Sequence, residues 1–288
     1  LRVYVMGERA INLENATADD IDAMRKLTAE GLRAGAFGFT TSRTNSHKTL
    51  TGGMVPSRYS QIDELLGIGR ALGDVGHGAF GMNSDFDIEE SELEWMTQLG
   101  KETGRPVWFL LTDRPTDDQR WRRLMDGVRK ARANGAMVTA QVPGRPVGVM
   151  LGADTALNPF SIRPSYQRLL QLPIAERMKR LQDPAVRAEV LADTPSEELL
   201  GRLSQFRQHI IRRWHRMFKL GNPPDYEPPA SASIAAIAER EGRTPDEVAY
   251  DYLAADPTNF IFFPVTGYNV DNHDVIREML TSEETVLG

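Results

Sequence analysis

Cysteine is absent from this 288-residue chain, which excludes disulfide bonds and every metal site built on thiolate ligands. Long apolar runs are also absent, and none approaches the roughly 18–20 residues that a membrane helix needs. No signal peptide is visible in the sequence. The formal net charge of −6 disfavours binding to nucleic acid or to anionic membranes. We therefore predict a cytoplasmic protein whose partner is neither a nucleic acid nor a membrane.

Histidine is scarce, with five residues, and none of the HxH, HExxH, GxSxG or P-loop patterns occurs. His209 and His215 lie six residues apart, which is not the i, i+4 spacing that lets two histidines share a metal on one helix face. His47 alone follows a predicted strand end. By spacing alone, the sequence contains no complete catalytic site.

What the sequence does contain is a regular alternation of helices and apolar strands. Thr17 and Asp20 form a capping box at the start of a helix. The tetrapeptide GAFG occurs twice, at 35–38 and 78–81, and predicts one structural solution used in two helix–strand units. The predicted strands start at 36, 79, 106 and 136, and the predicted helices between and after them cover 58–73, 89–103 and 117–134. A spacing of about 30 residues per unit suits a parallel sheet of (β/α)8 type.

This alternation of helices and strands ends after the fourth predicted strand. Residues 148–229 contain no convincing strand and predict a helical insertion, which includes an arginine-rich amphipathic stretch at 205–218. Helices at 231–241, 245–254 and 271–281 and a strand at 259–269 complete the pattern, and the C-terminal TVLG starts another strand. The predicted fold class is α/β, a partial (β/α)8 TIM barrel with a helical insertion. We expect residues 1–288 to form one incomplete barrel domain, because both ends read as cut from a longer chain.

Polar side chains gather where the predicted strands end, which is where barrels carry their chemistry. Arg43 and Arg145 each come directly after a predicted strand, and a guanidinium can hold a carboxylate by two parallel hydrogen bonds. Loops are polar in any protein, so each of these side chains can also be a solvated loop residue. The predicted substrate-binding residues are Ser42, Arg43, His47, Asn83, Asp85, Gln141 and Arg145.

Several segments together resemble one branch of the amidohydrolase superfamily, the N-acyl-D-amino-acid deacylases or D-aminoacylases. These segments are residues 16–57, which include GAFGFTTSRTNSHKT, and residues 104–111, 140–148, 158–166, 223–228 and 236–253. The resemblance spans essentially the whole chain. It implies the family fold, a distorted (β/α)8 barrel of the metal-dependent hydrolase type with a small β-domain built from the two chain ends. It also implies amide hydrolysis by metal-activated water, usually with zinc.

The same resemblance implies that the catalytic groups lie outside this chain. The family's N-terminal metal-binding histidine motif would precede residue 1, and its catalytic aspartate would follow residue 288. The family's middle-strand metal histidines correspond to positions 83–85 and 111–113, where this sequence has no histidine. The bridging cysteine of the family has no counterpart here either. We expect a mononuclear zinc site whose ligands come mostly from outside the chain, with Asp85 or Asp113 as a substitute oxygen ligand.

The function implied by the resemblance is metal-dependent hydrolysis of the amide of a small-molecule N-acyl amino acid. Arg43 would then recognise the free carboxylate of the substrate, and this segment alone would be inactive. Two alternatives stay open: a cyclic-amide or other hydrolase of the same superfamily, and a catalytically inactive barrel used for binding. A homo-oligomer is compatible with all three.

Overall fold

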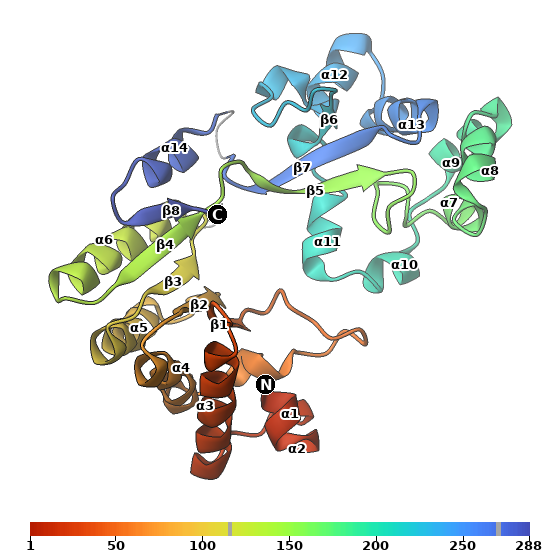
Figure 1. Cartoon of the computed structure of the whole chain (residues 1–288). Helices are drawn as coiled ribbons and strands as arrows, with labels where there is room; N and C mark the ends of the chain where they lie inside the picture. Colours follow the sequence, from red (N-terminus) through yellow and green to blue (C-terminus); the bar gives the residue numbers. More distant parts are fainter. Residues whose placement is uncertain (115–116, 269–271) are drawn as a thin grey trace. The chain divides into compact units, whose positions relative to one another are not determined.

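Five parallel strands form the main sheet of the protein, seen here in a computed structural model that describes residues 1–114, 117–268 and 272–288 (Figure 1). The strand order is β1-β2-β3-β4-β8, and every neighbouring pair is parallel. The strands are β1 (Gly38–Arg43), β2 (Ala79–Ser84), β3 (Val107–Leu110), β4 (Val138–Val142) and β8 (Thr285–Leu287). The predicted α/β class with a parallel sheet is confirmed, and the C-terminal TVLG does form a strand.

The chain divides into two compact units. Unit 1 comprises Leu1–Gly144 and Arg277–Gly288 and holds the parallel sheet, whereas unit 2 comprises Arg145–Ile276. The boundaries predicted for a single incomplete barrel domain stay a prediction.

The helices of unit 1 follow the predicted alternation with the strands, and α3 to α6 flank the sheet (Figure 1). Thr17 accepts from the backbone N–H of Asp20 while the Asp20 carboxylate accepts from the backbone N–H of Thr17, so the predicted capping box begins α3. The helices are α1 (Arg2–Met6), α2 (Glu8–Ile11), α3 (Ala18–Arg33), the 3₁₀ turn η1 (Pro56–Tyr59), α4 (Ile62–Val75), α5 (Glu89–Thr103) and α6 (Arg120–Ala133).

The two GAFG tetrapeptides adopt the same conformation at the turn from a helix into a strand. Gly35 and Gly78 both have positive φ, 109° and 95°, which allows the sharp turn from helix into strand. Gly38 and Gly81 lie within strands at points of close approach, where a Cβ atom would come within 2.1 Å of the Ala79 carbonyl oxygen and 2.2 Å of Trp108, respectively. The prediction of one structural solution used in two helix–strand units is confirmed.

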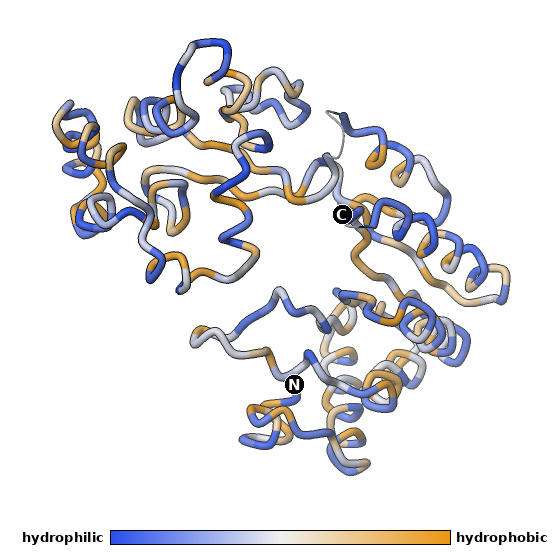
Figure 2. Tube along the Cα trace, turned by 180° about the vertical axis from the view of Figure 1, so that it is seen from behind, coloured by the Kyte–Doolittle hydropathy of each residue, from blue (hydrophilic) through white to orange (hydrophobic). Residues whose placement is uncertain are grey.

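Alternate side chains of β2 point to opposite faces of the sheet. Phe80 is fully buried and packs edge to face on Trp95 of α5, with 5.6 Å between ring centroids. Gly81 lies instead beneath Trp108 of the next strand. The helices of both units alternate between hydrophilic and hydrophobic stretches, as amphipathic helices must (Figure 2). One face of the sheet therefore builds the core, and the other is left for the site described below.

Unit 2 contains a second, antiparallel sheet of order β5-β7-β6 surrounded by short helices. Its elements are β5 (Val147–Gly152), α7 (Pro164–Leu169), α8 (Ile174–Leu181), α9 (Pro184–Ala192), α10 (Glu197–Gly201), α11 (Gln205–Ile210), η2 (Trp214–Arg216), β6 (Phe218–Leu220), η3 (Ala230–Ala232), α12 (Ile234–Glu241), α13 (Pro245–Ala255) and β7 (Phe260–Thr266). Helix α14 (Asp274–Leu280) crosses the unit boundary.

Three sequence expectations for this region were wrong. The segment 148–229 is not purely helical, because β5 and β6 occupy its two ends and pair with β7. The arginine-rich stretch at 205–218 is α-helical only as far as Ile210, and a single 3₁₀ turn, η2, follows. The strand predicted at 259–269 is β7, which pairs within the antiparallel sheet and does not join the parallel one; residue 269 lies outside the described residues.

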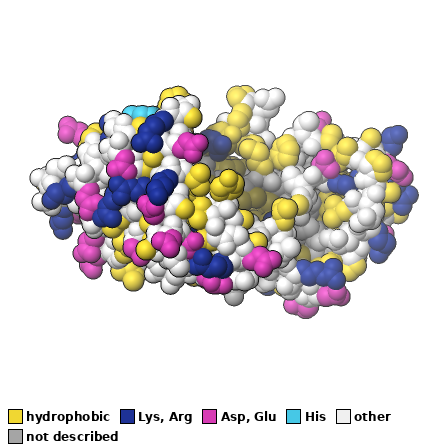
Figure 3. Space-filling model, turned by 60° about the horizontal axis from the view of Figure 1, so that its bottom comes forward, with side chains coloured by type: hydrophobic (Ala, Val, Ile, Leu, Met, Phe, Trp, Pro, Cys, Tyr) yellow, Lys and Arg dark blue, Asp and Glu magenta, His cyan; other side chains and the backbone are white. Residues whose placement is uncertain are grey.

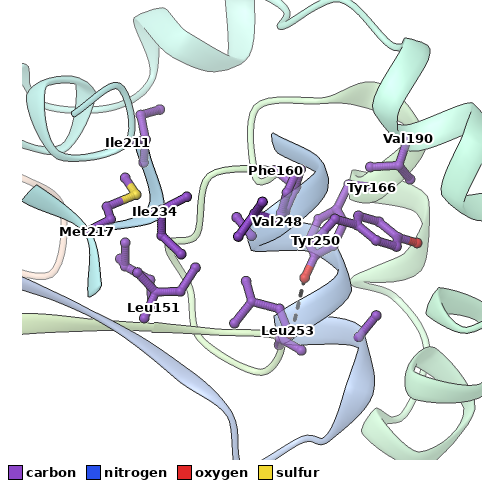
Figure 4. Packing of buried hydrophobic residues seen from close by; sticks show 14 of the residues in the cluster. Leu151, Phe160, Tyr166, Val190, Ile211, Met217, Ile234, Val248, Tyr250 and Leu253 are labelled. Atoms are coloured by element: carbon purple, nitrogen blue, oxygen red, sulfur yellow. Dashed lines mark hydrogen bonds between the residues drawn. The ribbon is translucent and has the colours of Figure 1, made fainter. Parts of the chain in front are cut away.

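The core of unit 2 is rich in aromatic residues (Figure 4). Tyr250 packs edge to face on Phe160 at 5.4 Å, and its hydroxyl donates to the Leu181 carbonyl oxygen at 3.0 Å. Tyr166 also packs on Phe160, with 5.9 Å between ring centroids, and burial raises the pKa of its hydroxyl to about 12. Both phenols are thus neutral at physiological pH and act as core residues.

None of the described helices is long and apolar enough to cross a membrane. On the face drawn in Figure 3, cationic and anionic side chains are interspersed. Many of them form ion pairs, for example the bidentate pair of Arg25 with Asp74.

Candidate functional site

A hollow of about 430 Å³ lies on the open face of the parallel sheet, at the carboxyl ends of its strands. We call it the strand-end hollow. Residues from β1 to β4 line it, and every second residue of each strand, such as Ser42, Asn83 and Gln141, points to this face. Its lining residues are Thr40, Thr41, Ser42, His47, Gly81, Met82, Asn83, Trp108, Leu110 and Gln141. Four of the seven predicted site residues, Ser42, His47, Asn83 and Gln141, are therefore brought together.

The strand register explains why these particular residues meet. Ser42 of β1 lies opposite Asn83 of β2, and Leu110 of β3 lies opposite Gln141 of β4. One step lower, Gly81 lies opposite Trp108. Polar Ser42, Asn83 and Gln141 thus share the layer at the strand ends with Leu110, and Trp108 lies in the layer below them.

The polar groups of the hollow differ in their hydrogen bonding. Ser42 Oγ and His47 Nδ1 are hydrogen-bonded at 2.8 Å. The side-chain amides of Asn83 and Gln141 have no hydrogen-bond partner among the described residues, although both face the hollow. An amide carries both donors and an acceptor, so these two groups are available to a polar ligand. Trp108 and Leu110 provide apolar surface beside them.

Arg43 does not belong to the hollow. It follows Ser42 in the strand, so its side chain turns to the helix side, where Nη1 donates to Oε1 of Glu92 at 2.8 Å. Glu92 lies in the first turn of α5, is only 6% exposed, and also accepts from Ser84 at 3.0 Å and from the indole of Trp95 at 2.6 Å. The charge of Arg43 is already matched, and the geometry gives it an anchoring role in place of the predicted carboxylate clamp.

Asp85 also lies outside the lining of the hollow, and its carboxylate holds the loop that carries His47. It accepts from the Thr44 hydroxyl at 2.8 Å and from the backbone N–H of Asn45 at 2.7 Å, and Arg114 lies 3.4 Å away. Burial by itself would raise the pKa of Asp85, but the hydrogen bonds from Asn45 and Thr44 and the charge of Arg114 outweigh it and lower the pKa. Asp85 is therefore an ionised anchor.

Asp85→Asn is expected to make unit 1 less sensitive to acid. A lowered folded-state pKa contributes stability that is present above the ordinary value of 3.8 and is lost as pH falls through the folded value. The wild type should therefore lose stability more steeply than the variant between about pH 4 and pH 2, while the variant is less stable at pH 7. Urea unfolding across this range measures both effects. Asp118→Asn, at an exposed position without a described hydrogen bond, is the control, and equal pH dependence in all three proteins would contradict the assignment.

Arg145 belongs to unit 2. Its guanidinium lies 4.9 Å from the ring centroid of Tyr226, and its Nη1 donates to the Pro146 carbonyl oxygen at 3.3 Å. Its predicted role at the substrate stays a prediction.

The described residues do not fit a metal site. They contain no group of three or more His, Asp or Glu side chains that could hold a metal ion. Asp85, one of the two predicted substitute ligands, is committed to the loop anchor, and Asp113, the other, is fully buried and already has an interaction partner. The hollow itself offers one imidazole, three hydroxyls and two neutral amides, which is a weak donor set for zinc. No catalytic step is therefore derived through a metal.

Sequence reasoning missed two kinds of residue. The sequence predicts Trp108 and Leu110 only as parts of a buried strand. In the structure Leu110 lies opposite Gln141, and Trp108 lies two residues before Leu110, so both side chains point to the open face. Glu92 was missed because a glutamate in the first turn of a helix is commonplace and nothing local marks it as buried.

No known family model and no curated protein sequence matches the chain. Its structural neighbours are D-aminoacylases. The crystal structure of D-aminoacylase, described as defining a novel subset of amidohydrolases, matches with a TM-score of 0.45 and 17% identity, over 100% of this chain and 45% of that one. A D-aminoacylase mutant in complex with copper chloride matches with a TM-score of 0.42 and 17% identity, over 95% of this chain and 43% of that one. The chain thus spans less than half the length of these remote neighbours, and the assignment of function rests on the strand-end hollow.

Proposed function

We propose that this chain forms the substrate-binding wall of an amide hydrolase acting on N-acyl amino acids. The observation that supports it is the strand-end hollow, where two unpartnered amides and a serine–histidine pair stand beside apolar surface. The sequence resemblance to N-acyl-D-amino-acid deacylases supports the same substrate class.

The chemistry of the hollow suits such a substrate. The amide of an N-acyl amino acid needs one donor and one acceptor, and Asn83 and Gln141 each offer both. An acyl chain or an apolar side chain would contact Trp108 and Leu110. No Arg or Lys is among the residues lining the hollow, so we assign recognition of the substrate carboxylate to the donors of Ser42 and His47 and no longer to Arg43.

The test is release of free amino acid from a panel of N-acetyl-D- and N-acetyl-L-amino acids, together with zinc content. It is run on the chain and on the whole natural protein, because the neighbours are more than twice as long. We expect release by the whole protein, selective for one configuration, with stoichiometric metal, and no release by the chain alone.

Hydantoins in the same panel separate the proposal from its alternative within the superfamily. Ring opening without release from N-acetyl amino acids would favour a cyclic-amide hydrolase. Neither activity, in a protein that purifies without metal, would contradict the proposal and leave a barrel used for binding.

A further inference from the structure

The serine–histidine pair of the hollow has the geometry of a nucleophile and its base. Ser42 Oγ lies 2.8 Å from His47 Nδ1, within the distance at which an imidazole takes up a hydroxyl proton. Both side chains line the hollow, so a bound molecule can reach the hydroxyl directly. The pair comes from a strand end and the loop five residues later, which keeps it at the carboxyl edge of the sheet.

The segment between the two members of this pair is anchored. Arg43, next to Ser42, is held by Glu92 at 2.8 Å. Thr44 and Asn45, which begin the loop to His47, are both held by Asp85, at 2.8 and 2.7 Å. Three consecutive residues after Ser42 are therefore fixed to carboxylates on the neighbouring elements. This support gives the hydroxyl the fixed position that a nucleophile needs.

One group that could donate a hydrogen bond to a developing oxyanion stands beside the hydroxyl. Asn83 lies opposite Ser42 in the register of β1 and β2, and its amide has no partner among the described residues. Gln141 lies three strands away on β4, so its amide is left for the far end of a bound ester. Side-chain amides are established donors to tetrahedral oxyanions. Trp108 and Leu110 supply an apolar wall for a small acyl group.

We propose that Ser42 and His47 form a metal-independent acyl-transfer site that accepts acyl groups from small esters. His47 Nδ1 takes the proton of Ser42 as Oγ bonds to the ester carbonyl carbon, and the oxyanion accepts a hydrogen bond from the side-chain amide of Asn83. The carbon–oxygen bond to the alcohol then breaks, and the alcohol leaves with the proton from His47. Water, deprotonated by His47, cleaves the acyl-serine to the carboxylic acid, and Ser42 regains its proton.

Esters are the expected substrates because His47 works without a third group. No hydrogen bond to its other ring nitrogen is made by the described residues. An alcohol or phenol leaves more readily than an amine and needs less help from the acid form of the histidine. The inference uses the same hollow as the proposed amide hydrolysis but neither its metal nor its substrate, so the two can fail separately.

The test uses the purified 288-residue chain with 4-nitrophenyl acetate and a fluorophosphonate. We expect a burst of about one nitrophenolate per chain and a covalent label that mass spectrometry maps to Ser42, both unchanged by 1,10-phenanthroline. Ser42→Ala should abolish the label, and His47→Gln should slow labelling by about 100-fold or more. Ser46→Ala, which removes a neighbouring exposed hydroxyl of the same loop, should label like the wild type.

Each other result overturns the proposal. Absence of labelling in the wild type, a label at another residue, or unchanged labelling in Ser42→Ala would exclude Ser42 as nucleophile. Loss of the burst with the chelator would exclude metal-independent chemistry. Mapping the label in the wild type needs no variant to fold, and amino-acid release from N-acetyl amino acids tests the proposed function independently.

Discussion

Replacement of Glu92 by alanine should destabilise unit 1 by about 3–5 kcal/mol, because it breaks a buried ion pair and leaves the other charge without a partner. The carboxylate is only 6% exposed and accepts hydrogen bonds from Arg43, Ser84 and Trp95 at 2.6–3.0 Å. Its removal leaves the donors of Arg43, Ser84 and Trp95 without their acceptor. Chemical denaturation followed by far-ultraviolet circular dichroism measures the change.

Two further variants make this test specific. Glu94→Ala removes an exposed carboxylate of the same helix and should change stability by no more than about 0.5 kcal/mol. The double variant Arg43→Met with Glu92→Leu removes both charges and should recover much of the stability lost in Glu92→Ala. A Glu92→Ala protein as stable as Glu94→Ala would mean that the carboxylate does not anchor the end of β1.

Gly81→Val should both destabilise the protein and close the strand-end hollow. A Cβ at Gly81 would come within 2.2 Å of Trp108 Cζ2 and 2.9 Å of Thr40 Cγ2, so the indole has to move. Overpacking of this kind costs about 1–3 kcal/mol. Because Trp108 lines the hollow, a displaced ring should also abolish ligand binding. The intrinsic fluorescence spectrum and the denaturation midpoint report the two effects.

The matched control is Gly31→Ala, in the interior of α3. An added Cβ meets nothing within 4 Å there, so the exchange should stabilise the helix by about 0.5–1 kcal/mol and leave binding unchanged. If Gly81→Val bound ligands like Gly31→Ala, the hollow would not be the binding site.

The features predicted correctly from sequence are those set by neighbours along the chain. The capping box of Thr17 and Asp20 forms as expected, since it needs only four residues. The two GAFG turns also form, because positive φ is a local property of glycine. The starts of β2 and β3 were predicted to within one residue of the observed strands for the same reason.

The errors arose where distant segments decide the outcome. The strands β5 and β6 exist because β7, which starts more than 100 residues after β5, pairs with both. A short stretch such as Phe218–Leu220 carries no strand signal of its own without that partner. Whether such a segment forms a strand depends on its tertiary contacts more than on the β-propensity of its residues.

In the candidate site, too, local features were predicted correctly and features that depend on distant segments were not. Ser42, His47, Asn83 and Gln141 lie together in the strand-end hollow because strand ends can be located by local pattern, and their role in binding stays a prediction. Arg43 was misassigned because the face to which a strand residue points depends on register, and a shift of one position reverses it. Once Ser42 is known to face the hollow, the pairing of Arg43 with Glu92 follows.

Ligand affinity in the strand-end hollow tests the central claim most directly. Isothermal titration calorimetry with an N-acetyl amino acid compares the wild type with the double variant Asn83→Ala, Gln141→Ala. The control is Gln98→Ala, at an exposed amide on α5 that donates to Glu102. Two lost hydrogen bonds of about 0.5–1.5 kcal/mol each predict an affinity about 5- to 150-fold weaker for the double variant and unchanged for the control. Equal affinity in all three proteins would contradict the claim that the hollow binds the substrate.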